Sequence, residues 1–168
     1  MPTTYLGILA IGLIWAAISD LTRRRVPNLT SAFVLLSGLV VDSVFFGVRG
    51  ALGGLAASFI VLFALYGFWR AGAIGGGDVK LAAAVGAWVG LSRLAWFGLS
   101  SAIAGGLVAV ICYMLAPRST RADVRANLVL AGLHGEMPPP QVVRRKQAVV
   151  VPYAVAIATG ATVALLVV

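Results

Sequence analysis

Long apolar stretches alternate with short charged segments along the whole chain. An α-helix needs roughly 20 apolar residues to cross a bilayer, and most of these stretches approach that length. The fourth is the shortest, about 22 Å at 1.5 Å per residue. The pattern predicts an all-α, polytopic membrane protein with six transmembrane helices. They are expected at residues 1–19, 29–48, 50–69, 79–92, 94–117 and 147–168.

The composition supports a membrane protein. Hydrophobic residues make up 61% of the chain and charged residues 11%, whereas a soluble domain carries about 25% charged residues. The single cysteine, Cys112, lies inside an apolar run and has no partner for an internal disulfide. No cluster of Cys and His has the spacing of a zinc site. We therefore expect neither a metal nor another cofactor.

Basic residues are unequally shared between the two sides that six spans would create. The first apolar run has no basic segment before it and is followed by Arg23 to Arg25, unlike a signal peptide. Positive charge after a first helix holds that end in the cytoplasm, so we expect the N-terminus outside. Eleven basic residues then fall inside, and two, Arg49 and Arg93, fall outside. The net charge of +8 is thus a topology signal rather than a sign of nucleic-acid binding.

We expect one membrane-embedded domain over residues 1–168, with residues 117–147 forming a cytoplasmic loop between helices 5 and 6. The segment from Thr120 to Asp123 is a capping-box pattern followed by apolar residues at helical spacing. It predicts a short amphipathic helix on the membrane surface that ends near Gly132 or Gly135.

Small residues recur at four-residue spacing, which lets helix backbones approach closely in lipid. We expect these pairs to pack helices within one bundle, with a homodimer interface as the alternative. The pairs are Gly50 and Gly54, Gly86 and Gly90, Ala102 and Gly106, and Ala156 and Gly160.

Three carboxylates adjoin predicted spans, where an ionisable group is costly and suggests function. Asp20 ends the first helix and Asp78 begins the fourth, so both lie at the inner side. Asp42 lies about 21 Å along the second helix from Asn28, in the outer half, where it is an interfacial residue or a partner of Arg49. Two neighbouring carboxylates share a proton. One then acts as base and the other as acid, which can activate water without a metal.

The alternative for each aspartate is a structural role, either capping its helix or pairing with a nearby cation. The glycines before Asp78 favour function, because Gly75, Gly76 and Gly77 can adopt unusual backbone angles and act as a hinge in a wet recess. An ordinary glycine-rich turn remains the alternative. Lys80 lies two residues after Asp78, on nearly the opposite helical face.

Two segments together resemble type IV prepilin peptidases, which are polytopic membrane aspartic proteases. "GGGDVKL" at 75–81 is similar to their G-x-G-D signature. "DLTRRRVPN" at 20–28 is similar to the segment with the first catalytic aspartate, and "VPYAVAIATG" at 151–160 resembles the last helix. The resemblance implies an endopeptidase of the bacterial or archaeal inner membrane that removes a leader from pilin-like precursors at the cytoplasmic face.

The resemblance also implies roles for individual residues. Asp20 and Asp78 correspond to the catalytic pair, and Gly75 and Gly77 to the motif glycines. The resemblance assigns no role to Lys80, and we expect Lys80 and Asn28 as candidates for contact with the substrate. The chain lacks the N-terminal cysteine-tetrad domain of longer members, so zinc and N-methylation are not expected. It is most similar to the short form that serves Flp/Tad pilus systems.

Two other functions are compatible with intramembrane carboxylates. A small ion- or proton-coupled transporter could use Asp20 and Asp78 as a relay, although its carboxylates should then be spread across the membrane depth. A non-catalytic assembly subunit would need neither carboxylate.

Overall fold

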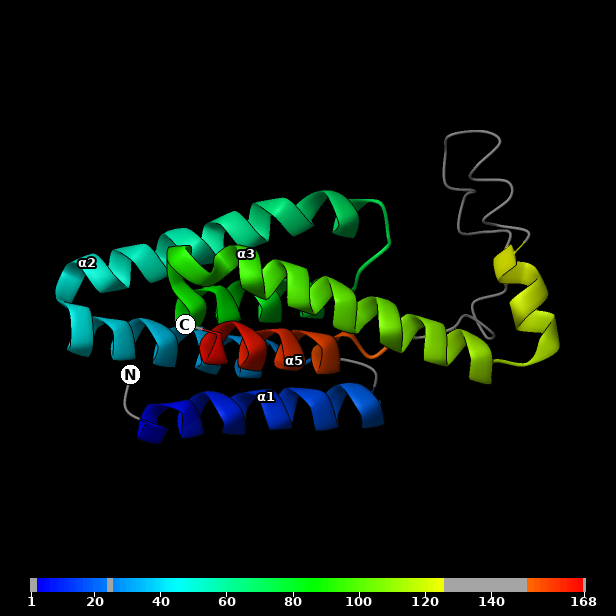
Figure 1. Ribbon diagram of the computed structural model, residues 1–168, viewed down its shortest axis with the longest axis horizontal. Coiled ribbons are helices and arrows are strands. Elements are labelled where there is room, and N and C mark those ends of the chain that lie inside the picture. The colour runs from blue at the N-terminus through cyan, green and yellow to red at the C-terminus, as the bar shows by residue number, and fades with distance from the viewer. Residues whose placement is uncertain (1–2, 24–25, 126–150, 168) are drawn as a thin grey trace. The chain divides into compact units, whose positions relative to one another are not determined.

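The computed structural model describes residues 3–23, 26–125 and 151–167, and these residues are helical with short connections (Figure 1). The helices are α1 (Thr3–Arg23), α2 (Asn28–Arg70), α3 (Gly76–Leu115) and α5 (Tyr153–Leu166). Residues 118–125 are also helical. Three helices, α1 to α3, contain apolar segments long enough to cross a membrane. These helices confirm the expectation of an all-α protein with apolar helices that can cross a membrane.

Helices α2 and α3 are each interrupted by a glycine. Gly47 has φ 65° and ψ −160°, and Gly90 has φ 69° and ψ 175°. This backbone region is essentially restricted to glycine. Nothing lies within 4 Å of the position that a Cβ would take at either residue, so conformation and not space requires glycine. The two halves of α2 run back along one another (Figure 1).

The breaks differ slightly from the expected boundaries. The apolar runs placed them at Arg49 and Arg93, whereas the backbone reverses two or three residues earlier. Charged residues therefore flank each turn and do not form it. The expectation that Gly90 packs helices together was wrong, because its open surroundings show that it serves the turn.

A third glycine ends α2. Gly72 has φ 74°, and its N–H donates to the Trp69 carbonyl at 2.9 Å. The N–H of Ala73 donates to the Phe68 carbonyl at 2.9 Å. These two bonds form a Schellman motif, which requires a left-handed residue and usually recruits glycine. The motif ends α2, and the chain continues from it to Gly75 and the start of α3.

The chain forms two compact units, Met1–Gly105 with Pro152–Val168, and Gly106–Val151. In the second unit the helix after Pro117 begins at residue 118, and the Arg121 N–H donates to the Pro117 carbonyl at 3.0 Å. The capping-box expectation was therefore wrong, because Thr120 already lies inside the helix and is buried. The predicted end near Gly132 or Gly135 lies outside the described residues.

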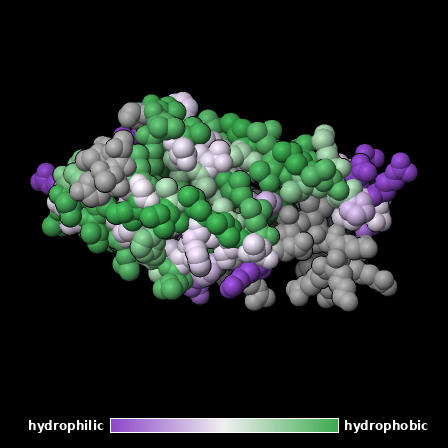
Figure 2. All heavy atoms as spheres, turned by 90° about the horizontal axis from the view of Figure 1, so that it is seen from below, coloured by the Kyte–Doolittle hydropathy of each residue, from purple (hydrophilic) through white to green (hydrophobic). Residues whose placement is uncertain are grey.

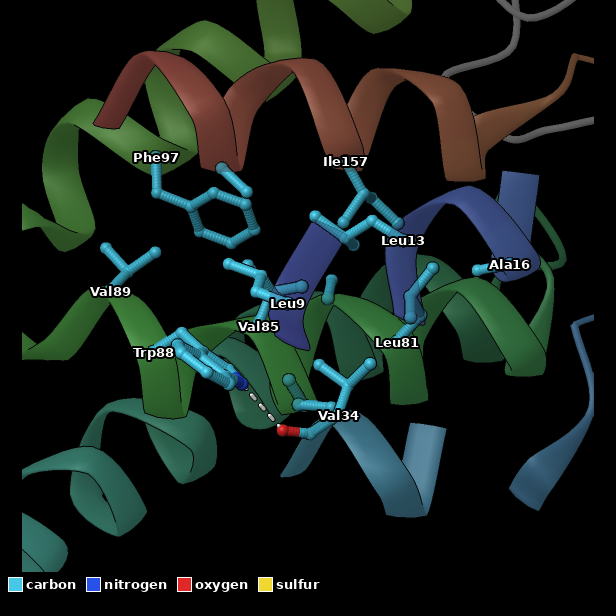
Figure 3. Packing of buried hydrophobic residues seen from close by; sticks show 14 of the residues in the cluster. Leu9, Leu13, Ala16, Val34, Leu81, Val85, Trp88, Val89, Phe97 and Ile157 are labelled. Atoms are coloured by element: carbon cyan, nitrogen blue, oxygen red, sulfur yellow. Dashed lines mark hydrogen bonds between the residues drawn. The ribbon is translucent and has the colours of Figure 1, made fainter. Parts of the chain in front are cut away.

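The core of the first unit joins α1, α2, α3 and α5 (Figure 3). Trp88 is its largest fully buried side chain, and its indole N–H donates to the Val34 carbonyl at 2.8 Å. Trp88 fits because residue 38 has no side chain. A Cβ on Gly38 would stand 2.7 Å from Trp88 Cδ1. One glycine on α2 thus makes room for the principal core residue of α3.

We expect Gly38→Val to destabilise the protein by about 1–3 kcal/mol, because the added side chain overpacks the site beside Trp88. Gly53→Val is the matched control, since nothing lies within 4 Å of a Cβ there. Thermal unfolding of both variants in the same detergent measures the difference. Equal unfolding temperatures would contradict the packing described for Trp88.

Other glycines allow close helix contact, as expected from their spacing. A Cβ on Gly86 would lie 3.1 Å from the Ser58 Cα, and one on Gly54 would lie 2.9 Å from the Ala87 carbonyl. A Cβ on Gly160 would meet the Ser101 backbone at 2.8 Å. The expected packing role is thus confirmed for these three residues. Each contact joins helices of the same chain.

Apolar side chains cover much of the outer surface of the helices (Figure 2). Ile11, Trp15 and Phe63 are 66%, 63% and 72% exposed. Exposure of so much apolar area to water is unfavourable, whereas contact of the same area with lipid tails is not. The surface therefore matches a protein embedded in a bilayer.

Candidate active site

Asp20 continues the buried stripe of α1. Leu9, Leu13 and Ala16 face the core at helical spacing, and Asp20 follows at the next position of that stripe with only 7% exposure. Its Oδ2 accepts a hydrogen bond from the Ala154 N–H at 3.2 Å. A carboxylate is thus carried into the protein interior by the same periodicity that buries the apolar residues.

The partner of Asp20 is the first turn of α5. Pro152 precedes this helix and supplies no side-chain cap, so the Asp20 carboxylate takes that position from another helix. Helix N-termini have free N–H groups and attract negative charge. Asp20 lies near the C-terminal end of α1, so the helix that it caps is α5 and not its own.

Asp78 is in the first turn of α3. The N–H groups of Asp78 and Val79 donate to the Gly75 carbonyl at 3.1 and 3.2 Å, which fixes the start of the helix. Asp78 Oδ1 is buried and has no hydrogen-bond partner among the described residues. Leaving a buried carboxylate oxygen unpaired is unfavourable. Such an oxygen is therefore favoured to carry a proton.

The fold brings these two carboxylates within electrostatic range of each other. The negative charge of Asp20 acts on Asp78, although they are far apart in the sequence. Helix α1 ends and α3 begins at this place, so the pair lies at one end of the helices. That both carboxylates lie at the same depth in the membrane stays a prediction.

Glycines 75–77 lie close to neighbouring groups. Among the described residues positive φ occurs at Gly47, Gly72 and Gly90, so residues 75–77 do not use it in this structure, and their role as a hinge stays a prediction. These residues provide space. A Cβ on Gly75 would stand 2.7 Å from Asp78 Oδ2, and one on Gly77 would stand 3.2 Å from the Val26 carbonyl. A Cβ on Gly76 would stand 3.1 Å from the Trp69 Nε1.

Lys80 and Asn28 meet each other on a separate face. The Lys80 ammonium donates to Asn28 Oδ1 at 3.0 Å, which joins the start of α2 to the start of α3. Both side chains line a groove between α2 and α3. Since Lys80 and Asp78 point to nearly opposite sides of α3, this pair lies apart from the carboxylates.

Asp42 is not part of this site. It is 6% exposed, and its Oδ2 stands 2.8 Å from the position of a Cβ on Gly54. Its expected partner Arg49 is exposed. The structure thus packs Asp42 between the two halves of α2, near the Gly47 turn.

Sequence reasoning missed the contribution of α5. The Ala154 N–H could have been suspected from Pro152, because proline commonly precedes or opens a helix. No feature of the sequence near Ala154 indicates that the cap of α5 comes from a residue more than a hundred positions away.

Comparison with known proteins shows which family the sequence matches. The sequence profile of the type IV leader peptidase family matches residues 7–110. This range is more than half of the chain and contains both carboxylates of the pair. No curated protein and no solved structure matches the chain.

Proposed function

Since the chain belongs to the type IV leader peptidase family, we propose that Asp20 and Asp78 are its catalytic residues. The protein is an aspartic-type prepilin peptidase, and it removes leader peptides from prepilins. The observation that carries the assignment is the unpaired Asp78 Oδ1 within electrostatic reach of Asp20. A transporter or an assembly subunit does not account for this family membership.

The chemistry needs one ionised and one protonated carboxylate. The ionised group removes a proton from water while the oxygen of that water attacks the scissile carbonyl carbon. The protonated group donates to the carbonyl oxygen. The C–N bond then breaks and the leaving nitrogen takes up a proton from the pair, while a hydroxyl of the tetrahedral intermediate returns a proton to the pair as the carboxyl product forms. The Ala154 N–H holds Asp20 in place during these steps.

We propose that six segments cross the membrane. Helix α2 has 43 residues, so a straight helix would extend about 65 Å, roughly twice the thickness of the hydrocarbon core. The reversal at Gly47 supports two crossings, and that at Gly90 supports two more in α3. Together with α1 and α5 these segments make six.

The proposed orientation places the N-terminus outside and the catalytic pair at the cytoplasmic face of the inner membrane. It follows from the eleven-to-two distribution of basic residues. Gly47 and Gly90 then lie at the outer face and Gly72 at the inner face. Residues 117–147 are the cytoplasmic loop of a single membrane domain in this proposal.

Single cysteines in a Cys112→Ser background test this orientation. Val48 is 73% exposed beside the Gly47 turn, and Ala71 is exposed beside the Gly72 turn. We expect a membrane-impermeant maleimide to label Val48→Cys in intact cells and Ala71→Cys only after the membrane is opened. Labelling of both variants in intact cells would contradict two crossings in α2.

A Flp/Tad-type precursor is the proposed substrate, as implied by the resemblance of the segments around Asp20 and Asp78. A homodimer stays a prediction. Gly54, Gly86 and Gly160 already pack against helices of their own chain, so they are occupied and do not form a surface for a second copy.

A further inference from the structure

A groove of about 310 Å³ lies between the two halves of α2 and the first half of α3. Most of its wall is apolar and includes Leu35, Leu55, Phe59 and Leu62. Phe59 is 50% exposed and Leu55 is 36% exposed. The groove is therefore open along the outer surface of the helices, where lipid surrounds the protein. Its volume falls in the range of small-molecule sites, about 300–1,000 Å³.

Two serines among the residues that line this groove have buried hydroxyls. Ser31 and Ser58 are 6% and 7% exposed, and their hydroxyl oxygens lie below the groove surface. Neither hydroxyl oxygen has a hydrogen-bond partner in the described part of the chain. Serine in a helix commonly satisfies its hydroxyl on a preceding carbonyl. Two unsatisfied hydroxyls beside one groove can donate hydrogen bonds to a ligand that reaches them.

The mouth of the groove carries positive charge. Lys80 and Asn28 lie there, and among the described residues their hydrogen bond leaves the Asn28 amide N–H groups and the remaining ammonium protons able to donate to a ligand. No carboxylate lines the groove. Its polar side chains, those of Asn28, Ser31, Ser58 and Lys80, can thus all donate hydrogen bonds. This arrangement suits an anion.

We propose that the groove binds an anionic phospholipid, with its phosphate at Lys80 and Asn28 and an acyl chain along Leu55 and Phe59. The two headgroup residues lie near the starts of α3 and α2, at the level where a bilayer has its headgroups. Ser31 lies one turn further, about 4.5 Å deeper, where the ester oxygens of a lipid follow its phosphate. A free phosphate has no apolar part that could pack against the apolar wall of the groove.

This assignment gives Lys80 and Asn28 a ligand other than the precursor. The groove and the catalytic pair share the start of α3, because Asp78 and Lys80 lie on opposite faces of the same turn. A bound lipid would hold α2 against α3 beside the active site. Lipid binding does not depend on peptide cleavage, so it can be measured whether or not Asp20 and Asp78 are catalytic.

Native mass spectrometry of the full-length, delipidated protein in detergent tests the proposal. Phosphatidylglycerol and phosphatidylcholine with identical acyl chains are the probes. We expect one phosphatidylglycerol to be retained in preference to phosphatidylcholine. Lys80→Gln should weaken retention at least about fivefold, and Ala32→Phe should abolish it by filling the groove that Ala32 lines.

Two controls match these changes. Arg70→Gln removes an exposed cation at the end of α2, and Ala64→Phe adds the same bulk to an exposed position of α2 outside the groove. Both should retain the lipid as the wild type does. If Ala32→Phe does not fold, the double variant Ser31→Ala with Ser58→Ala supplies the second readout, and we expect it to weaken retention.

Equal retention by wild type and Lys80→Gln, or no preference between the two lipids, would overturn the proposal. Displacement of the lipid by one equivalent of an uncleavable precursor peptide would also overturn it, because the groove would then be a substrate site.

Discussion

Asp20→Asn and Asp78→Asn each abolish precursor cleavage while the protein still inserts in the membrane. An amide neither accepts the proton of water nor supplies one to the scissile carbonyl, and acid–base groups contribute about 10²–10⁴-fold each. We expect a loss of at least about a thousandfold for either variant, measured as the cleaved fraction of a prepilin-like precursor in isolated membranes.

Asp42→Asn is the control for this experiment. Asp42 is buried in the same helical unit but lies apart from the pair, against Gly54. The Asp42→Asn variant should retain most of the cleavage activity. Cleavage by Asp78→Asn at the wild-type rate would remove the catalytic assignment, and a comparable loss in all three variants would point to a general requirement for buried carboxylates.

Gly75→Ala leaves the protein folded but reduces cleavage by about a hundredfold. The added methyl group would stand 2.7 Å from Asp78 Oδ2, so the carboxylate must move away. That atom is the end of a flexible side chain, which makes the movement inexpensive for stability. Catalysis depends on placement, and a displacement of about 1 Å can cost about 10²-fold in rate.

Gly67→Ala is the matched control, because nothing lies within 4 Å of a Cβ there. Cleavage rate and thermal unfolding should be measured on both variants. We expect similar unfolding temperatures and a loss of activity in Gly75→Ala alone. Unchanged activity would show that Asp78 does not need the position described here, and loss of folding would assign Gly75 to stability.

Apolar run length by itself determined that this is an all-α membrane protein, because a bilayer demands long apolar helices whatever their packing. The sequence also singled out Asp20 and Asp78 as an expected pair, since charge is rare and costly in such segments. Their catalytic role stays a prediction. The turns at Gly47 and Gly90 were located only to within two or three residues, because charge marks the membrane boundary and not the backbone reversal.

Only the tertiary structure decided which atoms surround the pair. The Ala154 N–H reaches Asp20 from a helix that begins more than a hundred residues later, and no local pattern encodes such a contact. The same holds for Gly75, where the sequence indicates a flexible residue and the packing shows a need for space beside Asp78. Lys80 and Asn28 are 52 positions apart, and they form the mouth of one groove because α2 doubles back at Gly47 and α3 packs between its halves. Long-range packing sets these neighbours, whereas spacing along the chain sets only which face of a helix each residue occupies.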